Sequence, residues 1–572
     1  MVTTAEEKAE ALASQYETVF TEEDKSNMPE KGPSPYTSME DIAISTNGII
    51  KLLKLLNPKK AIGPDLVSTY ILKEHAETIA PILNTIFQQS LDTGVVPKDW
   101  LKANVTAIYK KGSKTTPANY RPVSLTCISC KVLEHIVFSS IMKHSDTNHI
   151  IKQYQHGFRE KHSCETQLLT TVEEISRSLD KKHQTDLLIL DFAKAFDTVA
   201  HQRLINKLDF YGIRGKTKDW IENWLTERHQ TVVIDGKSSR AVRVKSGVPQ
   251  GTVLGPLLFT LFINDIGDNV TSKIRLFADD CLLYNTVSSK ADSDKLQEDL
   301  DKVVSWAETW QMRFNPIKCY HLQITRKKKP YCSKYTMMGV DLSKVESQTY
   351  LGVELTHDLS WNEHIKKTGA RANKALNFVR RNLYDCPTDI KETAYKALVR
   401  PHLEYSSTVW DPHYLNDINT LEKVQRKAAR FVLGKYRQRE SPTEMMKDLK
   451  WNSLQERRLV ARQTMLHKII SKTAAVQLPD YISKPRRITR GQHSRSFTNI
   501  SASTDSYQFS FFPRSVRCWN LLPEALVTAP SADQFKASLW KEIDRDSVIV
   551  RTPRDRKTSL GSSSGRGPVT VC

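Results

Sequence analysis

Three aspartates follow or separate short apolar segments, and their placement constrains the fold more than any other feature of the sequence. Asp191 comes directly after the apolar run 187–190, and Asp279-Asp280 lie between the apolar segments 274–277 and 281–284. The runs predict buried strands, and the last two predict a tight hairpin with two carboxylates at its tip. We expect these strands, together with a strand at 231–234, to form one antiparallel sheet.

Such carboxylates point to a particular chemistry. Acidic side chains on neighbouring strands repel one another unless divalent cations lie between them, and hard oxygen ligands suit Mg²⁺. Two such ions about 3.5–4 Å apart stabilise the attacking and leaving oxygens of an in-line phosphoryl displacement. Taken alone, Asp279-Asp280 is equally typical of a solvated turn. Together with Asp191, the pair predicts a two-metal phosphoryl-transfer site.

The charge of the chain indicates a polyanionic partner. The 572 residues include 84 Lys and Arg against 64 Asp and Glu, a formal net charge of +20, although surface lysines that serve only solubility are the alternative. The segment 421–433 has helical periodicity, with apolar residues on one face. The opposite face carries Lys423, Arg426, Lys427 and Arg430. This stripe is either a solvated face or a phosphate-binding surface.

Other features of the sequence indicate the cellular compartment of the protein and the segments that lack regular structure. The nine cysteines are scattered and odd in number, which predicts a reducing compartment. The longest uncharged stretch, 246–264, is interrupted by prolines and glycines, so we expect no membrane partner. The charged residues 1–35 predict a loose leader, 471–505 predict a polar linker, and 551–572 predict a disordered tail.

Ordered motifs carry a resemblance to a known family. Residues 277–280 (FADD) resemble the catalytic hairpin of reverse transcriptases, and 190–197 (LDFAKAFD) and 246–259 (SGVPQGTVLGPLLF) resemble two other motifs of that active site. Further strings occur in the family's order: ANYRPVSL (118–125), QHGFR (155–159), FNPIK (314–318) and YLG (350–352). The resemblance runs from about residue 57 to residue 540 and is strongest to LINE-type, jockey-like elements, which are non-LTR retrotransposons.

Four later strings resemble the C-terminal region of the same group but are not tied to known chemistry. They are PHLEY (401–405), LEKVQR (421–426), LKW with RR (449–451 and 457–458), and FFPR with WN (511–514 and 519–520). These strings support the placement in the family and no particular mechanism.

The resemblance implies an α+β right-hand polymerase with fingers, an antiparallel ferredoxin-like palm and a helical thumb, followed by a helical basic C-terminal region. The implied division is a partly disordered leader 1–56, fingers 57–185, palm 186–360, thumb 361–440, basic region 441–550 and disordered tail 551–572.

The resemblance also implies roles for single residues. Two Mg²⁺ ions, with Mn²⁺ as a substitute, are held by Asp191, Asp279, Asp280 and the backbone carbonyl of Phe192. Lys318 aligns with the lysine that protonates the pyrophosphate leaving group, with a surface lysine as the alternative. The dNTP is bound by Lys110 or Lys111, Arg121, Phe196, Gln250 and Gly251. In this set Phe196 is a steric gate against ribonucleotides, or else an ordinary core residue. The primer is held by Tyr350, Leu351 and Gly352.

The function implied is RNA-directed DNA polymerase activity, extending a 3′-OH primer on an RNA template with dNTPs. The implied partners are the element's own RNA and a DNA primer or target DNA. Only about fifty residues precede the fingers, so a separate endonuclease is an expected partner, and we expect the chain in the nucleus and cytoplasm. The alternatives are a catalytically dead nucleic-acid-binding remnant and an RNA-dependent RNA polymerase. The latter typically has glycine where Ala278 stands.

Overall fold

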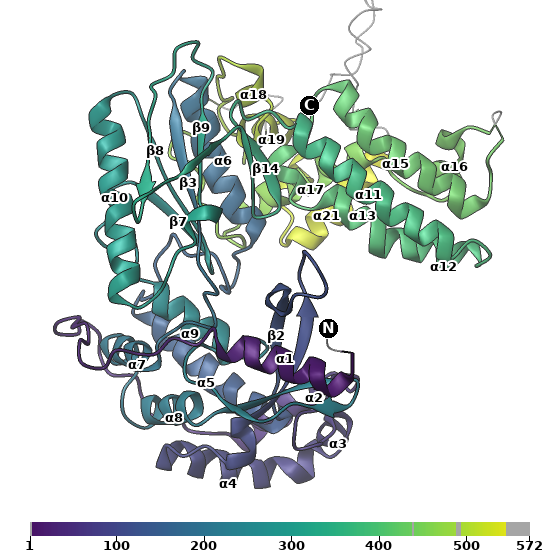
Figure 1. Cartoon of the computed structure of the whole chain (residues 1–572). Coiled ribbons are helices and arrows are strands. Elements are labelled where there is room, and N and C mark those ends of the chain that lie inside the picture. The colour runs from purple at the N-terminus through teal and green to yellow at the C-terminus, as the bar shows by residue number, and fades with distance from the viewer. Residues whose placement is uncertain (1–2, 438–439, 488–492, 545–572) are drawn as a thin grey trace, which may run out of the picture.

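The computed structural model describes residues 3–437, 440–487 and 493–544 (Figure 1). The tail 551–572, for which we expected disorder, lies outside the described residues. Figure 1 shows N-terminal helices below a sheet that carries β3, β7, β8 and β9, with helices of the C-terminal third to its right.

The aspartates belong to a sheet that we call the central sheet, with strand order β12-β9-β3-β8-β7. Its strands are β3 (Thr185–Asp191), β7 (Lys273–Phe277), β8 (Asp280–Thr286), β9 (Tyr320–Ile324) and β12 (Ser343–Val345). Strands β9, β3, β8 and β7 pair antiparallel, and β12 joins β9 in parallel. Helices α7–α9 lie between β3 and β7 in the sequence, and α10 lies between β8 and β9. This is the β-α-β-β-α-β order of ferredoxin-like sheets.

Burial on both faces explains why β3 is a continuous apolar run. Leu187 and Ile189 pack into one core cluster, and Leu188 and Leu190 pack into another. Alternate side chains of a strand point to opposite faces, so a strand covered on both sides needs apolar residues at every position. The run ends at Asp191, where the strand reaches the edge of the core. The side chain of Asp191 is only partly buried.

The expectation of a single sheet was wrong for residues 231–234. They lie in β4, in a second sheet of order β2-β1-β4-β5, in which β6 also pairs with β4. Its strands are β1 (Lys102–Tyr109), β2 (Tyr120–Leu125), β4 (His229–Ile234), β5 (Lys237–Ser238) and β6 (Val242–Arg243). Strand β4 runs parallel to β1, about 125 residues earlier in the sequence, with Val105 opposite Val232. Local periodicity identifies a strand but carries no information on so distant a partner.

The expected loose leader is instead partly helical and packed. Helix α1 (Ala5–Glu17) begins with a capping box between Thr4 and Glu7, which satisfies backbone N–H groups of its first turn. Its apolar residues Ala9, Leu12, Ala13 and Tyr16 recur at helical spacing and pack against Val105, Val232 and Val242 of the second sheet. The amphipathic spacing overrides the high charge of the segment.

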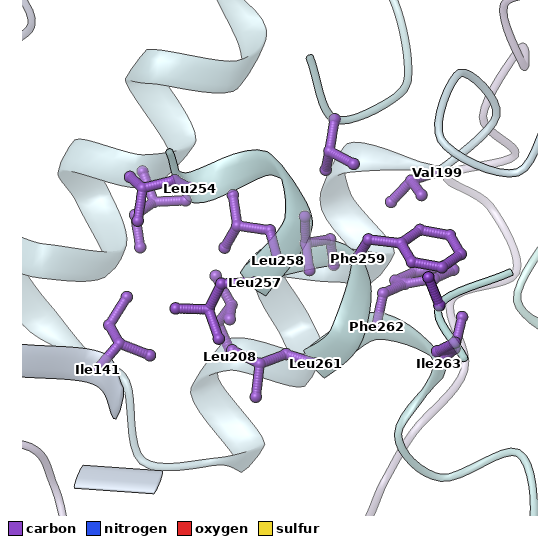
Figure 2. Packing of buried hydrophobic residues seen from close by; sticks show 14 of the residues in the cluster. Ile141, Val199, Leu208, Leu254, Leu257, Leu258, Phe259, Leu261, Phe262 and Ile263 are labelled. Atoms are coloured by element: carbon purple, nitrogen blue, oxygen red, sulfur yellow. The ribbon is translucent and has the colours of Figure 1, made fainter. Parts of the chain in front are cut away.

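The remaining helices of the N-terminal part surround a large core, part of which Figure 2 shows. They are α2 (Thr46–Lys54), α3 (Thr69–Glu74), α4 (Ala76–Thr93), η1 (Lys98–Leu101), η2 (Pro117–Asn119), α5 (Ile128–Thr147), α6 (Cys164–Asp180), α7 (His201–Phe210), α8 (Gly215–Thr226), α9 (Leu254–Ile263), α10 (Lys290–Thr309) and η3 (Pro316–Lys318). Helix α9 is buried on nearly every side, including Leu258, Phe259 and Phe262. Its hydrophobicity therefore serves the protein interior, and within the described ranges no helix is long and apolar enough to cross a membrane.

The C-terminal third is mainly helical after two small hairpins. The hairpins are β10 (Thr336–Met337) with β11 (Val340–Asp341), and β13 (Ser347–Tyr350) with β14 (Val353–Thr356). The helices are α11 (Asn362–Asn382), α12 (Thr388–Ala394), the π-helix η4 (Tyr395–Val399), α13 (Arg400–Glu404), α14 (Ser407–Trp410), α15 (Leu415–Leu433), α16 (Pro442–Asp448), α17 (Leu454–Ile470), α18 (Asp505–Gln508), α19 (Phe511–Trp519), α20 (Glu524–Val527) and α21 (Ala532–Asp544).

Two expectations for this third can be compared with the structure. The two faces predicted for 421–433 are confirmed in α15, where Leu421, Val424 and Ala428 are buried and Lys423 and Lys427 are exposed. The expected linker 471–505 has no helix or strand in its described residues before α18. It is nevertheless more than a linker, because Val476, Ile482 and Phe497 are buried in the core of this third.

Candidate active site

The three aspartates meet at one end of the central sheet. Asp191 is the last residue of β3 and lies opposite Asp280, the first residue of β8. Strands β7 and β8 form a hairpin in which Phe277 pairs with Asp280 and Ala278-Asp279 make the turn. The predicted hairpin with carboxylates at its tip is therefore present, and its tip lies beside the end of β3.

A neighbouring segment holds this hairpin in place. Ala278 has a positive φ of +52°, a backbone conformation that costs free energy for a residue with a side chain. Its N–H donates to Oε1 of the buried Gln155 at 3.2 Å, and the N–H of Gly157 donates to the same oxygen at 2.7 Å. Gln155 also forms a β-bridge with Leu276. The string QHGFR, which contributed to the family resemblance without an assigned chemical role, thus supports the turn that carries Asp279.

The carboxylates and nearby cations influence one another's pKa. Burial, followed by the charges of Asp279 and Asp191, raises the pKa of Asp280 to about 6, although its side chain keeps solvent contact. Burial, and then the charge of Asp191, also raises the pKa of Asp279. Lys110 and Arg121 oppose both shifts. Closely spaced carboxylates of this kind are stabilised by a cation between them.

The donor set fits a hard divalent cation, because it consists of carboxylate oxygens beside a strand end. Among residues 3–437, 440–487 and 493–544, no three His, Cys, Asp or Glu side chains are grouped closely enough to hold a metal ion. Asp191, Asp279 and Asp280 thus lie at adjacent positions of the strand ends, and binding of Mg²⁺ or Mn²⁺ by them is a proposal.

Lys318 and Phe192 lie beside the end of β3. The Nζ of Lys318 is 3.8 Å from Oδ2 of Asp191, and the N–H of Asn315 donates to the Asp191 carbonyl at 2.8 Å. The ring of Phe192 stacks on Phe314 with centroids 4.1 Å apart. The string FNPIK is therefore placed against Asp191, while the role of the Phe192 carbonyl stays a prediction.

The β1–β2 hairpin brings basic side chains toward the aspartates. Burial, followed by the charge of Arg121, lowers the pKa of Lys110, whereas Asp191 acts in the opposite direction. Lys110 is thus close enough to Asp191 to interact with it electrostatically. The sequence left Lys110 and Lys111 as alternatives. The charge of Lys110 is among the main influences on the pKa of Asp279 and Asp280, and the choice between the two lysines stays a prediction.

Phe196 lies in a packed but partly exposed position. Its ring stacks on Phe259 of α9 with centroids 4.3 Å apart, and the edge of Phe158 approaches it at 6.2 Å. The N–H of Val248 donates to the Phe196 carbonyl at 2.8 Å. Packing on one side and partial exposure fit both the gate and the core-residue alternatives, so the gate role stays a prediction.

The loop with Gln250 and Gly251 contacts β2 and the segment that follows β3. Nε2 of Gln250 donates to Oδ1 of Asp197 at 3.1 Å, and its carbonyl accepts from the N–H of Ser124 in β2 at 2.8 Å. Gly251 has φ +96°, and a Cβ there would lie 2.8 Å from the Ser124 carbonyl oxygen. Asp197 was missed as a site residue, although it closes the string LDFAKAFD and contacts Gln250.

The remaining predicted nucleic-acid residues lie in the β13–β14 hairpin and on α15. Burial raises the pKa of Tyr350, and this residue is close enough to Asp280 for that carboxylate's charge to contribute to the raised pKa. Tyr350 is only 2% exposed and its hydroxyl accepts a hydrogen bond from Gln167, so its side chain supports the β13–β14 turn from inside. Leu351 and Gly352 form that turn, and Tyr405 donates to the Leu351 carbonyl at 3.1 Å. Lys423, Arg426, Lys427 and Arg430 lie on α15, which packs against α11 and α16.

Gly157 offers a test of the support given to the hairpin. A Cβ at this position would lie 2.4 Å from the backbone nitrogen of Ala278, so Gly157→Ala should displace the turn that carries Asp279. Because small misplacements of catalytic groups are costly, we expect any activity that depends on Asp279 to fall by about 100-fold. Gly48→Ala in α2, where the nearest atom is 3.7 Å away, is the matched control. Equal activities of the two variants in an extension assay would contradict the supporting role.

Comparison with known proteins finds a family model that matches the part of the chain that carries this site. Residues 108–355 match the family model described as "Reverse transcriptase (RNA-dependent DNA polymerase)". This range contains the β1–β2 hairpin, the central sheet and all three aspartates. Residues 108–355 of the chain are therefore similar to the reverse-transcriptase domain.

The similar proteins are polymerases of mobile elements and transposons. The chain is 28% identical over 459 residues to the RNA-directed DNA polymerase from mobile element jockey of Drosophila melanogaster, covering 75% of this chain and 49% of that protein. It is 29% identical over 405 residues to the jockey polymerase of Drosophila funebris, covering 68% and 44%. The probable polymerase from transposon BS of Drosophila melanogaster is 27% identical over 454 residues, covering 75% and 49%. The matches span about half the length of these relatives.

Proposed function

We propose that the chain is an RNA-directed DNA polymerase of a non-LTR retrotransposon, which extends a 3′-OH primer on an RNA template with dNTPs. The observation that carries the proposal is the placement of Asp191, Asp279 and Asp280 at adjacent strand ends, with Lys110 and Arg121 facing them. Carboxylates that bind metal and cations that bind triphosphate are the two parts that a nucleotidyl transfer requires.

Each group has a distinct task in this reaction. Asp191, Asp279, Asp280 and the Phe192 carbonyl would hold two Mg²⁺ ions, which, when bound, polarise the primer hydroxyl and the α-phosphate. Lys110 and Arg121 would bind the triphosphate, for which an ammonium and a planar guanidinium are suited. Lys318, 3.8 Å from Asp191, would donate a proton to the departing pyrophosphate.

The elements correspond to a right-hand arrangement in this proposal. The β1–β2 hairpin and the N-terminal helices act as fingers, the central sheet as palm, and the helices from α11 onward as thumb and basic region. The turn with Leu351 and Gly352 holds the primer. The exposed cations of α15 track phosphates. The partners proposed are the element's RNA, target DNA and a separate endonuclease, which would place the chain in the nucleus and in the cytoplasm.

The direct test is extension of a labelled DNA primer on an RNA template by the full chain with dNTPs and Mg²⁺. We expect a DNA product that EDTA abolishes and that Mn²⁺ restores at least in part. Extension with rNTPs in preference to dNTPs would replace the proposal by an RNA-dependent RNA polymerase. Tight primer–template binding without any product under all metal conditions would favour a dead remnant.

Phe196 provides a test of substrate selection. A ring beneath the sugar of the incoming nucleotide clashes with a 2′-hydroxyl, so Phe196→Ala should raise the incorporation of rNTPs relative to dNTPs by about 10-fold or more, the range of one mismatched contact. Phe196→Tyr keeps the ring that stacks on Phe259 and should retain discrimination. The measurement is the ratio of kcat/KM for one dNTP and the matching rNTP. An unchanged ratio in Phe196→Ala would leave Phe196 as a core residue.

A further inference from the structure

Three strings that had no chemical role in the sequence interpretation meet at one cavity. The strings are PHLEY, LEKVQR and the pair LKW and RR, and all of them lie between residues 401 and 458. Residues that belong to these strings or adjoin them surround an open cavity of about 240 Å³. Its lining includes Lys396, Arg400, Gln425, Lys450, Trp451 and Arg457. The cavity lies between η4, α13, α15 and the start of α17, away from the strands that carry the aspartates.

The cavity has a surplus of positive charge. Glu392 pairs with Lys396 at 2.5 Å and accepts from Nε1 of Trp451 at 2.7 Å. Glu404 accepts two hydrogen bonds from the guanidinium of Arg457, one of them at 3.0 Å, and lies 3.8 Å from Arg400. These two carboxylates face the four cations of the lining, so a net charge of about +2 remains for an anion.

The backbone at the cavity has one unusual feature. Residues 395–399 form the π-helix η4, in which the N–H of Arg400 donates to the Tyr395 carbonyl. Such a turn is rare and is found frequently at functional sites. It carries Lys396, which lines the cavity. Lys450 has φ +52° just after α16, where the N–H of Trp451 donates to the Met446 carbonyl at 2.8 Å; this is a common left-handed helix ending, and it places Lys450 at the cavity.

The floor of the cavity is held rigidly by buried hydrogen bonds. Gln425 is 1% exposed; its Oε1 accepts from the Tyr395 hydroxyl at 2.9 Å, and its Nε2 donates to the Asn452 carbonyl at 2.9 Å. The rings of Tyr395 and Trp451 stack with centroids 4.5 Å apart. A binding site that is already ordered loses little conformational entropy when its ligand binds.

We propose that this cavity binds a phosphate group of a nucleic-acid strand, at a site separate from the polymerase centre. Arginine and lysine side chains around one opening provide the charge-assisted hydrogen bonds that a phosphodiester accepts. The cavity is also linked to the β13–β14 turn that contains Leu351 and Gly352. Glu404, which pairs with Arg457 at the cavity, is followed in the sequence by Tyr405, and the hydroxyl of Tyr405 donates to the Leu351 carbonyl. The inference rests on the proposed function for the identity of the ligand, a nucleic-acid strand, and not for catalysis.

The test compares two lysines three residues apart. Lys450 lines the cavity, whereas Lys447 is exposed on α16 outside the lining. Binding of fluorescent single-stranded RNA and of an RNA–DNA duplex to the full chain is measured by anisotropy, in EDTA and over a salt series. Lys450→Glu should raise the Kd of at least one of these probes by about 5- to 10-fold and reduce the salt slope by about one. Lys447→Glu should change the Kd by less than about twofold.

Two further measurements complete the test. The double variant Lys396→Gln and Lys450→Gln, which removes charge without reversing it, should weaken strand binding in the same direction, and melting curves verify that each variant is folded. Inorganic phosphate is added to wild type in a parallel series. Thermal stabilisation by inorganic phosphate that Lys450→Glu removes, with unchanged strand binding, would identify a small-anion site and overturn the proposal. Equal Kd values for Lys450→Glu and Lys447→Glu with both probes would also overturn it.

The outcomes separate this proposal from the proposed function. Because binding is measured in EDTA, it does not depend on turnover. A chain that binds strands through Lys450 but extends no primer would contradict the polymerase proposal alone. A chain that extends primers but is indifferent to Lys450→Glu in both binding probes would contradict the cavity proposal alone.

Discussion

Asp279→Ala is expected to reduce primer extension by at least about 10³-fold, because it removes one of the carboxylates that we propose to bind metal at the end of the central sheet. The side chain lies at the tip of the β7–β8 hairpin and interacts with Asp191 and Asp280. Loss of one ligand leaves the attacking and leaving oxygens without full charge stabilisation in the transition state. Single-turnover extension on a saturating primer–template measures this loss without interference from product release.

Binding of the primer–template should be retained in the same variant. Asp279 adds negative charge to the site, so its removal does not weaken attraction for a polyanion. We expect a Kd within about twofold of wild type. Asp294→Ala, an exposed aspartate on α10, is the matched control and should extend primers normally. Wild-type extension by Asp279→Ala would remove the aspartates from the mechanism.

Asp411→Asn is expected to cause the largest loss of stability. Asp411 is buried and lies between three arginines: Nε of Arg458 is 2.7 Å from Oδ1, NH1 of Arg514 is 3.1 Å from Oδ2, and Arg462 also contacts Oδ2. Burial alone would raise the pKa of Asp411, but Arg514, Arg462 and Arg458 hold it below its ordinary value. The carboxylate is thus ionised and joins α17 and α19 to the end of α14.

The asparagine variant leaves these buried arginines without a compensating charge. Breaking a buried ion pair by removal of one partner costs about 3–5 kcal/mol, and we expect a loss in this range from the free energy of unfolding of the C-terminal third. Denaturant titration followed by limited proteolysis locates the loss. Asp385→Asn, at an exposed aspartate of the same region, should change stability by less than about 0.5 kcal/mol. Similar stabilities of the two variants would show that the arginines are satisfied without Asp411.

Local patterns predicted much of the fold and of the candidate site. The apolar run before Asp191 and the apolar segments on either side of Asp279-Asp280 predicted β3 and the β7–β8 hairpin. For β3, burial on both faces explains why every position of the run is apolar. The two faces of α15 followed from helical periodicity. The error at 231–234 arose because pairing of β4 with β1 depends on residues about 125 positions away.

The supporting groups of the site could not be predicted from the sequence. The side-chain oxygen of Gln155 accepts hydrogen bonds from the N–H groups of Gly157 and Ala278. The sequence does not show which backbone groups a buried amide will contact, so this supporting role could not be predicted. Tyr350 matched a motif for primer binding, yet its side chain points into the core toward Gln167. A motif therefore identifies a position in the chain, while burial decides which atoms of that position are accessible to a ligand.

The second sheet combines strands that are distant in the sequence, so the chain cannot be cut between them without breaking the sheet. Strands β1 and β2 come from residues before 126, whereas β4, β5 and β6 come from residues after 228, on the far side of β3 in the sequence. A fragment that ends near residue 185 lacks the parallel neighbour of β1 and the β4 surface on which α1 packs. Recombination between related elements would therefore preserve folding only if its breakpoints leave residues 5–243 from one parent.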